Sequence, residues 1–328
     1  MSMLKLFAVA LPVALLSTGA LAADETIAVF TKNQTNPYFQ TVRVGAEVAA
    51  KSMGAKVVHY IPTKPDSIPE QLSQIEDVIV KKPSAIVFVP VDYKAMVPGV
   101  EQINDAKIPV VNVTDRSAGG KFLAFVGADD YSLGLETGRF LLNEMGGKGN
   151  VVILEGVKGS LTSIDRVRGF NDAIKEFKDV KLLASQPANY QRLQGLQVME
   201  NLMQSHPRID GVLAANDAMA IGAIEALDGA NRRAMIIGIN GTKEAVDAIK
   251  SGKLLASGDY SGFMQGCVGT MVAIRALRNE TIIGELVLKP TVVNASNYKP
   301  YDVPLEARTC PTWAEVVTMA TAKPTKTN

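Results

Sequence analysis

The feature that most constrains the fold is an alternation of short aliphatic runs with amphipathic stretches of helical length, which extends from Thr26 to about Lys289. The aliphatic runs are rich in β-branched residues, apolar on both faces and bounded by turn residues, which is typical of buried parallel strands. The stretches between them have the 3.6-residue periodicity of helices. This order predicts an α/β protein with parallel sheets covered by helices.

The alternation occurs twice. The first series predicts strands at 27–30, 56–60, 85–89 and 109–113, with helices at 37–53, 66–81 and 92–106. The second predicts strands at 150–154, 180–184, 211–214, 235–239 and 254–258, with helices near 163–177, 193–205, 218–227 and 243–251. Segments 82–92 and 206–217 also share a proline, an aliphatic strand and an Asp placed to cap the next helix. The sequence therefore predicts two doubly wound lobes of one architecture.

Residues 1–22 have the three parts of a cleavable signal peptide. Lys5 supplies a positive charge, residues 6–16 form an apolar run too short to span a bilayer, and Ala20 and Ala22 satisfy the small-residue requirement of signal peptidase. Cleavage is expected after Ala22, with export to the periplasm. The alternative is a buried first helix of a cytosolic protein. No cysteine near the cleavage site offers a thiol for a lipid, so a soluble protein without a lipid anchor is expected.

The length, the charge and the cysteines of the chain bear on the number of domains, on its partners and on a disulfide. What remains after cleavage is longer than one core usually supports, which suggests two domains of about 150 residues. The chain has 34 Lys and Arg against 33 Asp and Glu, which argues against a nucleic-acid or anionic-membrane partner. Cys267 and Cys310 are the only cysteines and would meet an oxidising compartment. A disulfide between them and two inert apolar side chains are both open.

Motifs of catalysis are missing from the sequence. There is no glycine-rich dinucleotide fingerprint, Walker motif, HExxH or GxSxG. The two histidines, His59 and His206, belong to no recognisable motif, and no residue pairs with Asp115 as a proton-transfer partner. We therefore expect no cofactor, no metal site and no enzymatic activity.

Polar and aromatic side chains follow the predicted strands, where the ligand crevice of an open parallel sheet lies. The first strand is followed by Asn36, Tyr38 and Phe39, with Pro37 at the first helical position. Later strand ends supply Asp115, Arg116, Arg166, Tyr190, Asn216, Asn240 and Tyr260. Carboxylate, guanidinium and amide groups bond hydroxyls, and aromatic rings cover the C–H face of a sugar. The mixture predicts a small neutral polyhydroxylated ligand.

Five segments carry a family resemblance. They are Asn36-Pro37-Tyr38-Phe39, Ile108-Pro109-Val110-Val111 with Asp115-Arg116, Arg166-Val167-Arg168-Gly169-Phe170, residues 184–190 and residues 215–223. Together they resemble the ribose-binding type of periplasmic sugar-binding protein, the substrate-binding component of a carbohydrate ABC importer, from 26 to about 293. The resemblance implies the type I periplasmic binding protein fold, with two lobes joined by a hinge of three segments near 126–129, 257–259 and 288–292.

The resemblance also implies which side chains hold the sugar. The expected ligand-binding set is Asn36, Tyr38, Phe39, Asp115, Arg116, Arg166, Tyr190, Asn216, Asn240 and Tyr260. Three positions depart from the ribose pattern: Val89 replaces an amide, Asn240 an aspartate and Tyr260 a glutamine. One extra residue also precedes Asp115. These changes alter which hydroxyls can be satisfied, so pentose, hexose, sugar alcohol and inositol all remain open.

Other readings of single residues stay open beside the ligand roles. Asp92, Asp129 and Asp217 are more typical of helix caps or hinge anchors than of ligand contacts. Arg168 is expected in a supporting ion pair, and Tyr190 could belong to the core.

The expected lobes are 23–126 with 260–288, and 127–259 with 289–321, followed by a disordered tail at 322–328. A monomer that closes around its ligand and is then recognised by an ABC permease is the predicted mechanism. A ligand-binding protein for a chemoreceptor or membrane sensor, and a binder of a non-carbohydrate polar solute, are alternatives. A lac-type regulator would have an N-terminal helix-turn-helix of about 60 residues, whereas here the first predicted strand follows the predicted export signal almost at once.

Overall fold

The computed structural model describes residues 25–320 and 325–326. The predicted signal peptide and its cleavage site lie outside the described residues. Most of the predicted disordered tail also lies outside them, but Thr325–Lys326 (β14) pairs antiparallel with Thr281–Ile282 (β11), so disorder does not extend over the whole tail.

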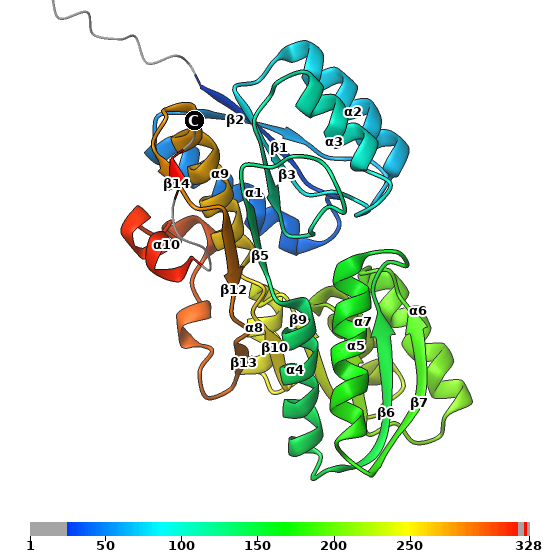
Figure 1. Ribbon diagram of the computed structural model, residues 1–328. Helices are drawn as coiled ribbons and strands as arrows, with labels where there is room; N and C mark the ends of the chain where they lie inside the picture. Colours follow the sequence, from blue (N-terminus) through cyan, green and yellow to red (C-terminus); the bar gives the residue numbers. More distant parts are fainter. Residues whose placement is uncertain (1–24, 321–324, 327–328) are drawn as a thin grey trace, which may run out of the picture.

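Within residues 25–320 the longer strands form two six-stranded sheets, one in each lobe (Figure 1). The first has the order β12-β5-β4-β3-β1-β2, and its paired strands are all parallel. Its strands are β1 (Thr26–Phe30), β2 (Lys56–Tyr60), β3 (Ala85–Phe88), β4 (Val110–Val113), β5 (Phe125–Ala128) and β12 (Glu285–Leu288). Its helices are α1 (Pro37–Ser52), α2 (Ile68–Lys81), α3 (Val97–Asp105) and α9 (Gly262–Leu277).

The second sheet has the order β13-β10-β9-β8-β6-β7 and is parallel except for β13 at its edge. Its strands are β6 (Lys148–Glu155), β7 (Asp179–Pro187), β8 (Gly211–Ala214), β9 (Met235–Ile239), β10 (Ala256–Gly258) and β13 (Val292–Asn294). Its helices are α4 (Asp130–Glu144), α5 (Leu161–Lys175), α6 (Arg192–Ser205), α7 (Asp217–Gly229) and α8 (Lys243–Lys250). The predicted α/β fold of two doubly wound lobes is confirmed.

The described chain crosses between the two sheets at three places. The crossings follow β5, β10 and β12, so the first sheet takes its last strand, β12, from far along the chain. In Figure 1 the crossing strands β5 and β12 run side by side between the lobes, in agreement with their parallel pairing. This is the predicted hinge of three segments.

Local sequence signals fix several helix ends. The side chain of Asn36 accepts a hydrogen bond from the backbone N–H of Tyr38 at 3.1 Å, and Pro37 begins α1. Asp129 caps α4, as expected. Asp92 accepts from the backbone N–H groups of Lys94 and Ala95, but α3 begins only at Val97 with Met96 as its cap, so the expectation that Asp92 caps this helix is wrong. Asp217 is not a cap either, because Asn216 is the cap of α7 and Asp217 is its first residue.

The C-terminal segment returns to the first lobe. After β13 the chain passes through Lys299–Tyr301 and Leu305–Ala307, two short 3-10 helices, and reaches α10 (Trp313–Met319). Cys310 forms a disulfide with Cys267 of α9, and the guanidinium of Arg275 lies 4.2 Å from the ring of Trp313. The disulfide is thus present. The expectation that all of residues 289–321 belong to the second lobe is wrong, because the end of this segment packs on α9 of the first lobe (Figure 1).

None of the helices in the described part of the chain combines the length and the hydrophobicity that a membrane crossing requires.

Candidate ligand-binding cavity between the lobes

A cavity lies between the lobes, and residues of both lobes line it. Nearly all of its lining residues follow the carboxyl end of a strand or open the next helix, as the rule for parallel sheets requires. The lining residues are Lys32, Asn33, Asn36, Tyr38, Phe39, Asp66, Thr114, Asp115, Thr162, Arg166, Tyr190, Asn216, Asn240 and Tyr260.

The structure brings together all but one of the residues proposed from sequence. Arg116 is the exception: its guanidinium pairs with Glu285 of β12 and lies 3.8 Å from the ring centre of Phe125 of β5. The chain turns at Thr114, where φ is 68°, and only Asp115 of the next two residues faces the cavity. The expected grip of Arg116 on the ligand is therefore wrong, because its charge is satisfied on the outer side of the hinge.

Five lining residues were not proposed from sequence. They are Lys32, Asn33, Asp66, Thr114 and Thr162. Lys32, Asn33 and Thr114 lie within three residues of the end of a strand, so the rule that selected Asn36 and Asp115 would also have found them if applied to every polar position. Asp66 lies in the loop after β2, and Thr162 in the first turn of α5.

The first lobe contributes a wall of paired charges and aromatic rings. The Nζ atom of Lys32 lies 2.7 Å from Oδ2 of Asp115, and both side chains are almost fully buried. Asn33 donates from Nδ2 to Asp66 at 3.2 Å, and burial raises the pKa of Asp66. Tyr38 is buried, and burial raises the pKa of its hydroxyl, so this group stays protonated.

The second lobe contributes Arg166, which is 1% exposed. Its Nε donates to Oδ1 of Asp130 at 2.8 Å and its Nη1 to the backbone oxygen of Ala215 at 2.7 Å. Its buried Nη2 has no hydrogen-bond partner among the described residues. Burial, the largest single effect, lowers the pKa of Arg166, but Asp130, Tyr190 and Tyr260 together raise it by more, so the guanidinium stays positive.

Two amides complete the second wall. Asn216 uses its side-chain oxygen to cap α7 and donates from Nδ2 to the backbone oxygen of Tyr190 at 3.2 Å. The buried Oδ1 of Asn240 accepts no hydrogen bond from the described part of the chain. Tyr190 lines the cavity, and burial raises the pKa of its hydroxyl. The wall thus presents an unused donor on Arg166, an unused acceptor on Asn240 and the unused hydroxyl of Tyr190.

The lobes are closed on each other at the cavity. The hydroxyl of Thr162 in α5 donates to Oδ1 of Asp115 at 2.5 Å, and that of Thr35 donates to Oε1 of Gln191 at 2.8 Å. Each of these bonds joins a residue of one lobe to a residue of the other. The cavity is therefore formed by closure and would open when the lobes separate.

The charges around the cavity balance. Lys32 and Arg166 are opposed by Asp66 and Asp115. Among the described residues no group of three or more His, Cys, Asp or Glu side chains could hold a metal ion. The arrangement suits an uncharged ligand that both accepts and donates hydrogen bonds.

Residues 27–281 match the model of a periplasmic binding protein domain. The chain belongs to the periplasmic binding protein family. The ribose import binding protein of Haemophilus influenzae is 31% identical over 277 residues, which cover 84% of this chain and 94% of that protein. The resemblance to ribose-type binding proteins is thereby confirmed.

Two solved structures of this family hold different ligands. An ABC transporter periplasmic solute binding protein from Actinobacillus succinogenes with bound D-allose is 32% identical, with a TM-score of 0.80, and the match covers 84% of this chain and all (100%) of that one. A solute binding protein from Bacillus halodurans with bound myo-inositol is 27% identical, with a TM-score of 0.79, and the match covers 85% of this chain and 97% of that one. The same fold thus accommodates a sugar and a cyclic polyol.

Proposed function

We propose that this protein captures a neutral sugar or sugar alcohol in the cavity between its lobes and delivers it to the permease of an ABC transporter. The observation that carries the proposal is that three cavity-lining residues of the second lobe have buried hydrogen-bonding atoms without a partner: Nη2 of Arg166, the hydroxyl of Tyr190 and Oδ1 of Asn240. A buried polar atom without a partner costs about 1–3 kcal/mol. A ligand hydroxyl, which both donates and accepts, would satisfy any of these atoms.

The ligand class follows from the walls of the cavity. The rings of Tyr38, Phe39 and Tyr190 supply flat apolar surface, and the balanced charges disfavour a ligand with a net charge. The relatives described above are a ribose import protein and proteins with bound D-allose and myo-inositol. Their names describe binding proteins, which gives an enzymatic role no support.

Closure is the proposed signal to the transporter. Ligand contacts from both lobes stabilise the closed form only to the extent that they are lost on opening. We propose that the exported protein acts as a periplasmic monomer without a lipid anchor after cleavage behind Ala22, and that the permease recognises its closed form.

Thermal unfolding of the mature protein tests the proposal. The panel is D-ribose, D-allose, xylitol and myo-inositol, with an amino acid and a nucleotide as controls. A ligand at about 100 times its Kd adds about 2.7 kcal/mol to stability and raises the unfolding temperature. A shift with a panel compound supports the proposal, whereas shifts with the controls alone would refute it.

Two arginine variants sharpen this test. Arg166→Ala removes the unused donor and should abolish the shift. Arg116→Ala is the matched control, because Arg116 follows Asp115 in the chain but points away from the cavity toward Glu285 and Phe125. It should keep the full shift. Equal losses in both variants would contradict the assignment of the cavity.

A further inference from the structure

Asp130 does not line the cavity, but it forms an ion pair with Arg166, which does. Asp130 is the first residue of α4, where the first crossing segment enters the second lobe. Its neighbour Asp129 caps the helix by accepting from the backbone N–H of Ser132 at 2.9 Å, so Asp130 is not needed as the cap. The side chain of Asp130 is 12% exposed and pairs with the nearly buried Arg166.

The three nitrogen atoms of the Arg166 guanidinium have different hydrogen-bond partners. Nε is held by Asp130 and Nη1 by the backbone of Ala215, which leaves Nη2 as the unused nitrogen of a residue that lines the cavity. Because the guanidinium is planar, fixing Nε and Nη1 also fixes the direction of the N–H bonds of Nη2. The backbone contact alone would let the group turn about the Nη1 bond. Asp130 is therefore the side chain that sets the direction of Nη2.

The two helices that carry this pair touch backbone to backbone. A Cβ atom on Gly134 of α4 would lie 2.2 Å from the backbone oxygen of Arg166, and one on Gly169 of α5 would lie 2.4 Å from that of Tyr131. Both distances are far below van der Waals contact, so only glycine allows this approach. The close packing holds the start of α4 and Arg166 in a fixed relation.

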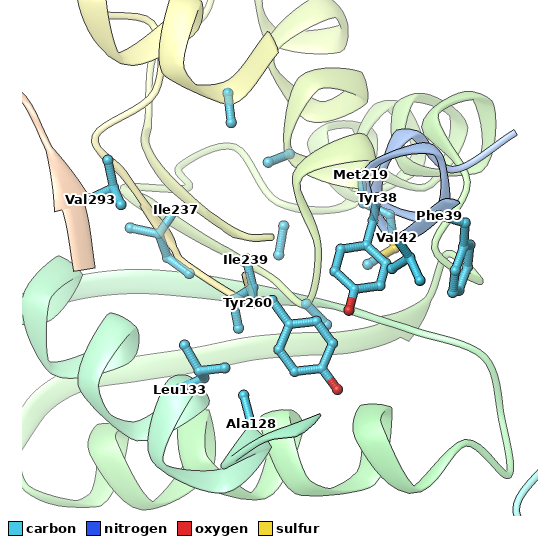
Figure 2. Packing of buried hydrophobic residues seen from close by; sticks show 14 of the residues in the cluster. Tyr38, Phe39, Val42, Ala128, Leu133, Met219, Ile237, Ile239, Tyr260 and Val293 are labelled. Atoms are coloured by element: carbon cyan, nitrogen blue, oxygen red, sulfur yellow. The ribbon is translucent and has the colours of Figure 1, made fainter. Parts of the chain in front are cut away.

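Tyr260 links the pair to the hinge. It follows β10 in the second crossing segment, and its hydroxyl lies 3.0 Å from Oδ2 of Asp130 and 3.3 Å from the backbone oxygen of Thr114. The Arg166 guanidinium lies 4.2 Å from the centre of its ring, a favourable cation–π distance. The centre of the Tyr260 ring also lies 5.1 Å from that of Tyr38 in the first lobe (Figure 2). Asp130 thus connects Arg166 to an aromatic ring that contacts both lobes.

We propose that Asp130 is a positioning residue that sets ligand affinity by holding Arg166, and with it Nη2, in the direction of the bound ligand. The proposal rests on the proposed function, because it assigns Arg166 to the ligand. It predicts that a residue outside the cavity changes affinity as strongly as many residues inside it.

The variants Asp130→Ala and Asp130→Asn test this role, with Asp129→Asn as the matched control. Asp129 is adjacent in sequence, bonds only Ser132 with its side chain in the described hydrogen-bond network, and does not touch Arg166. Circular dichroism establishes that each variant is folded. Asp130→Asn keeps an oxygen that can accept a hydrogen bond from Nε of Arg166. If Asp130→Ala does not fold, the affinity of Asp130→Asn can still be compared with that of Asp129→Asn.

The first readout needs no ligand. The ¹⁵N–¹H NMR signal of Arg166 Nε–H, assigned by its loss in Arg166→Lys, should be protected from exchange with water in the wild-type protein and in Asp129→Asn. In Asp130→Ala this protection should be lost. A signal that is unchanged in Asp130→Ala would overturn the proposal.

The second readout is calorimetric titration with D-allose, xylitol and myo-inositol. Asp130→Ala should weaken binding about 30-fold or more, Asp130→Asn less than about 10-fold, and Asp129→Asn not measurably. In an Arg166→Lys background, Asp130→Ala should cost no more than about a further 3-fold, because the two residues act as one unit. Additive losses, or equal losses in the Asp129 and Asp130 variants, would overturn the proposal. If the wild-type protein binds none of the probes, the proposed function and the role of Asp130 in ligand affinity both fail. The NMR readout still decides whether Asp130 holds Arg166.

Discussion

The disulfide between Cys267 and Cys310 should contribute a large share of the stability of this protein. The two cysteines are 43 residues apart, and the loop they close runs through strands of both sheets. For a loop of this length, the loss of chain entropy in the unfolded state is about 13 cal/mol/K, or about 4 kcal/mol at 25 °C. Removing the bond should therefore lower the free energy of unfolding by about 4 kcal/mol. For a mature chain of about 300 residues, the unfolding temperature should then fall by about 6 °C.

Urea unfolding of oxidised and reduced protein measures this effect without a mutation. Cys310→Ala removes the bond but keeps the buried Cys267 side chain, and Cys267→Ala/Cys310→Ala removes both. The difference in free energy of unfolding between the single and the double variant measures the packing contribution of the Cys267 side chain. The contribution of loop closure can then be separated from it. A loss below about 1 kcal/mol on reduction would refute the loop argument. It would mean that the remaining contacts hold the C-terminal segment as well without the bond.

Two further predictions concern stability. Burial raises the pKa of Asp217 to about 6, although Ser257 and Thr242 donate hydrogen bonds to it. Because the folded pKa lies above the unfolded one, the stabilisation is full below about pH 4 and lost by about pH 6, a change of about 3 kcal/mol. Asp217→Asn should gain that amount relative to wild type in urea titrations between pH 4 and pH 7, and a constant difference would contradict it. Gly45→Ala should cost at least about 2 kcal/mol, because its Cβ would lie 2.1 Å from the backbone oxygen of Phe263 and push α1 and α9 apart. Gly229→Ala is its control, since the described residues leave open space there, and comparable losses in both variants would refute the packing argument.

Most elements of the two lobes were predicted from local pattern, but two long helices, α4 and α9, and the short C-terminal helix α10 were not. Strands such as β1 and β8 are fully apolar between turn residues, and α2 has a distinct apolar face, so local pattern identifies them. The helix α9 is buried on almost all sides between the first sheet and α1, so it lacks a polar face. The helix α4 packs closely on α5 through small residues such as Gly134 and Gly138. Neither helix was among those proposed from periodicity.

By itself, the sequence determined the two lobes and the strand ends at which the cavity lies, whereas the hinge segments were implied by the family resemblance. The lobes and the strand ends follow from local pattern and from the geometry of parallel sheets, whose carboxyl ends share an edge. The tertiary structure alone decided which strand-end side chains face inward. Asp115 and Arg116 are adjacent, but Arg116 is drawn outward by Glu285, which comes from a strand far along the chain. The role of Asp130 is likewise invisible in the sequence, because it depends on a helix crossing and on Tyr260, which lies 130 residues away. Local pattern encodes which residues reach the cleft, and only long-range packing fixes the direction in which each side chain points.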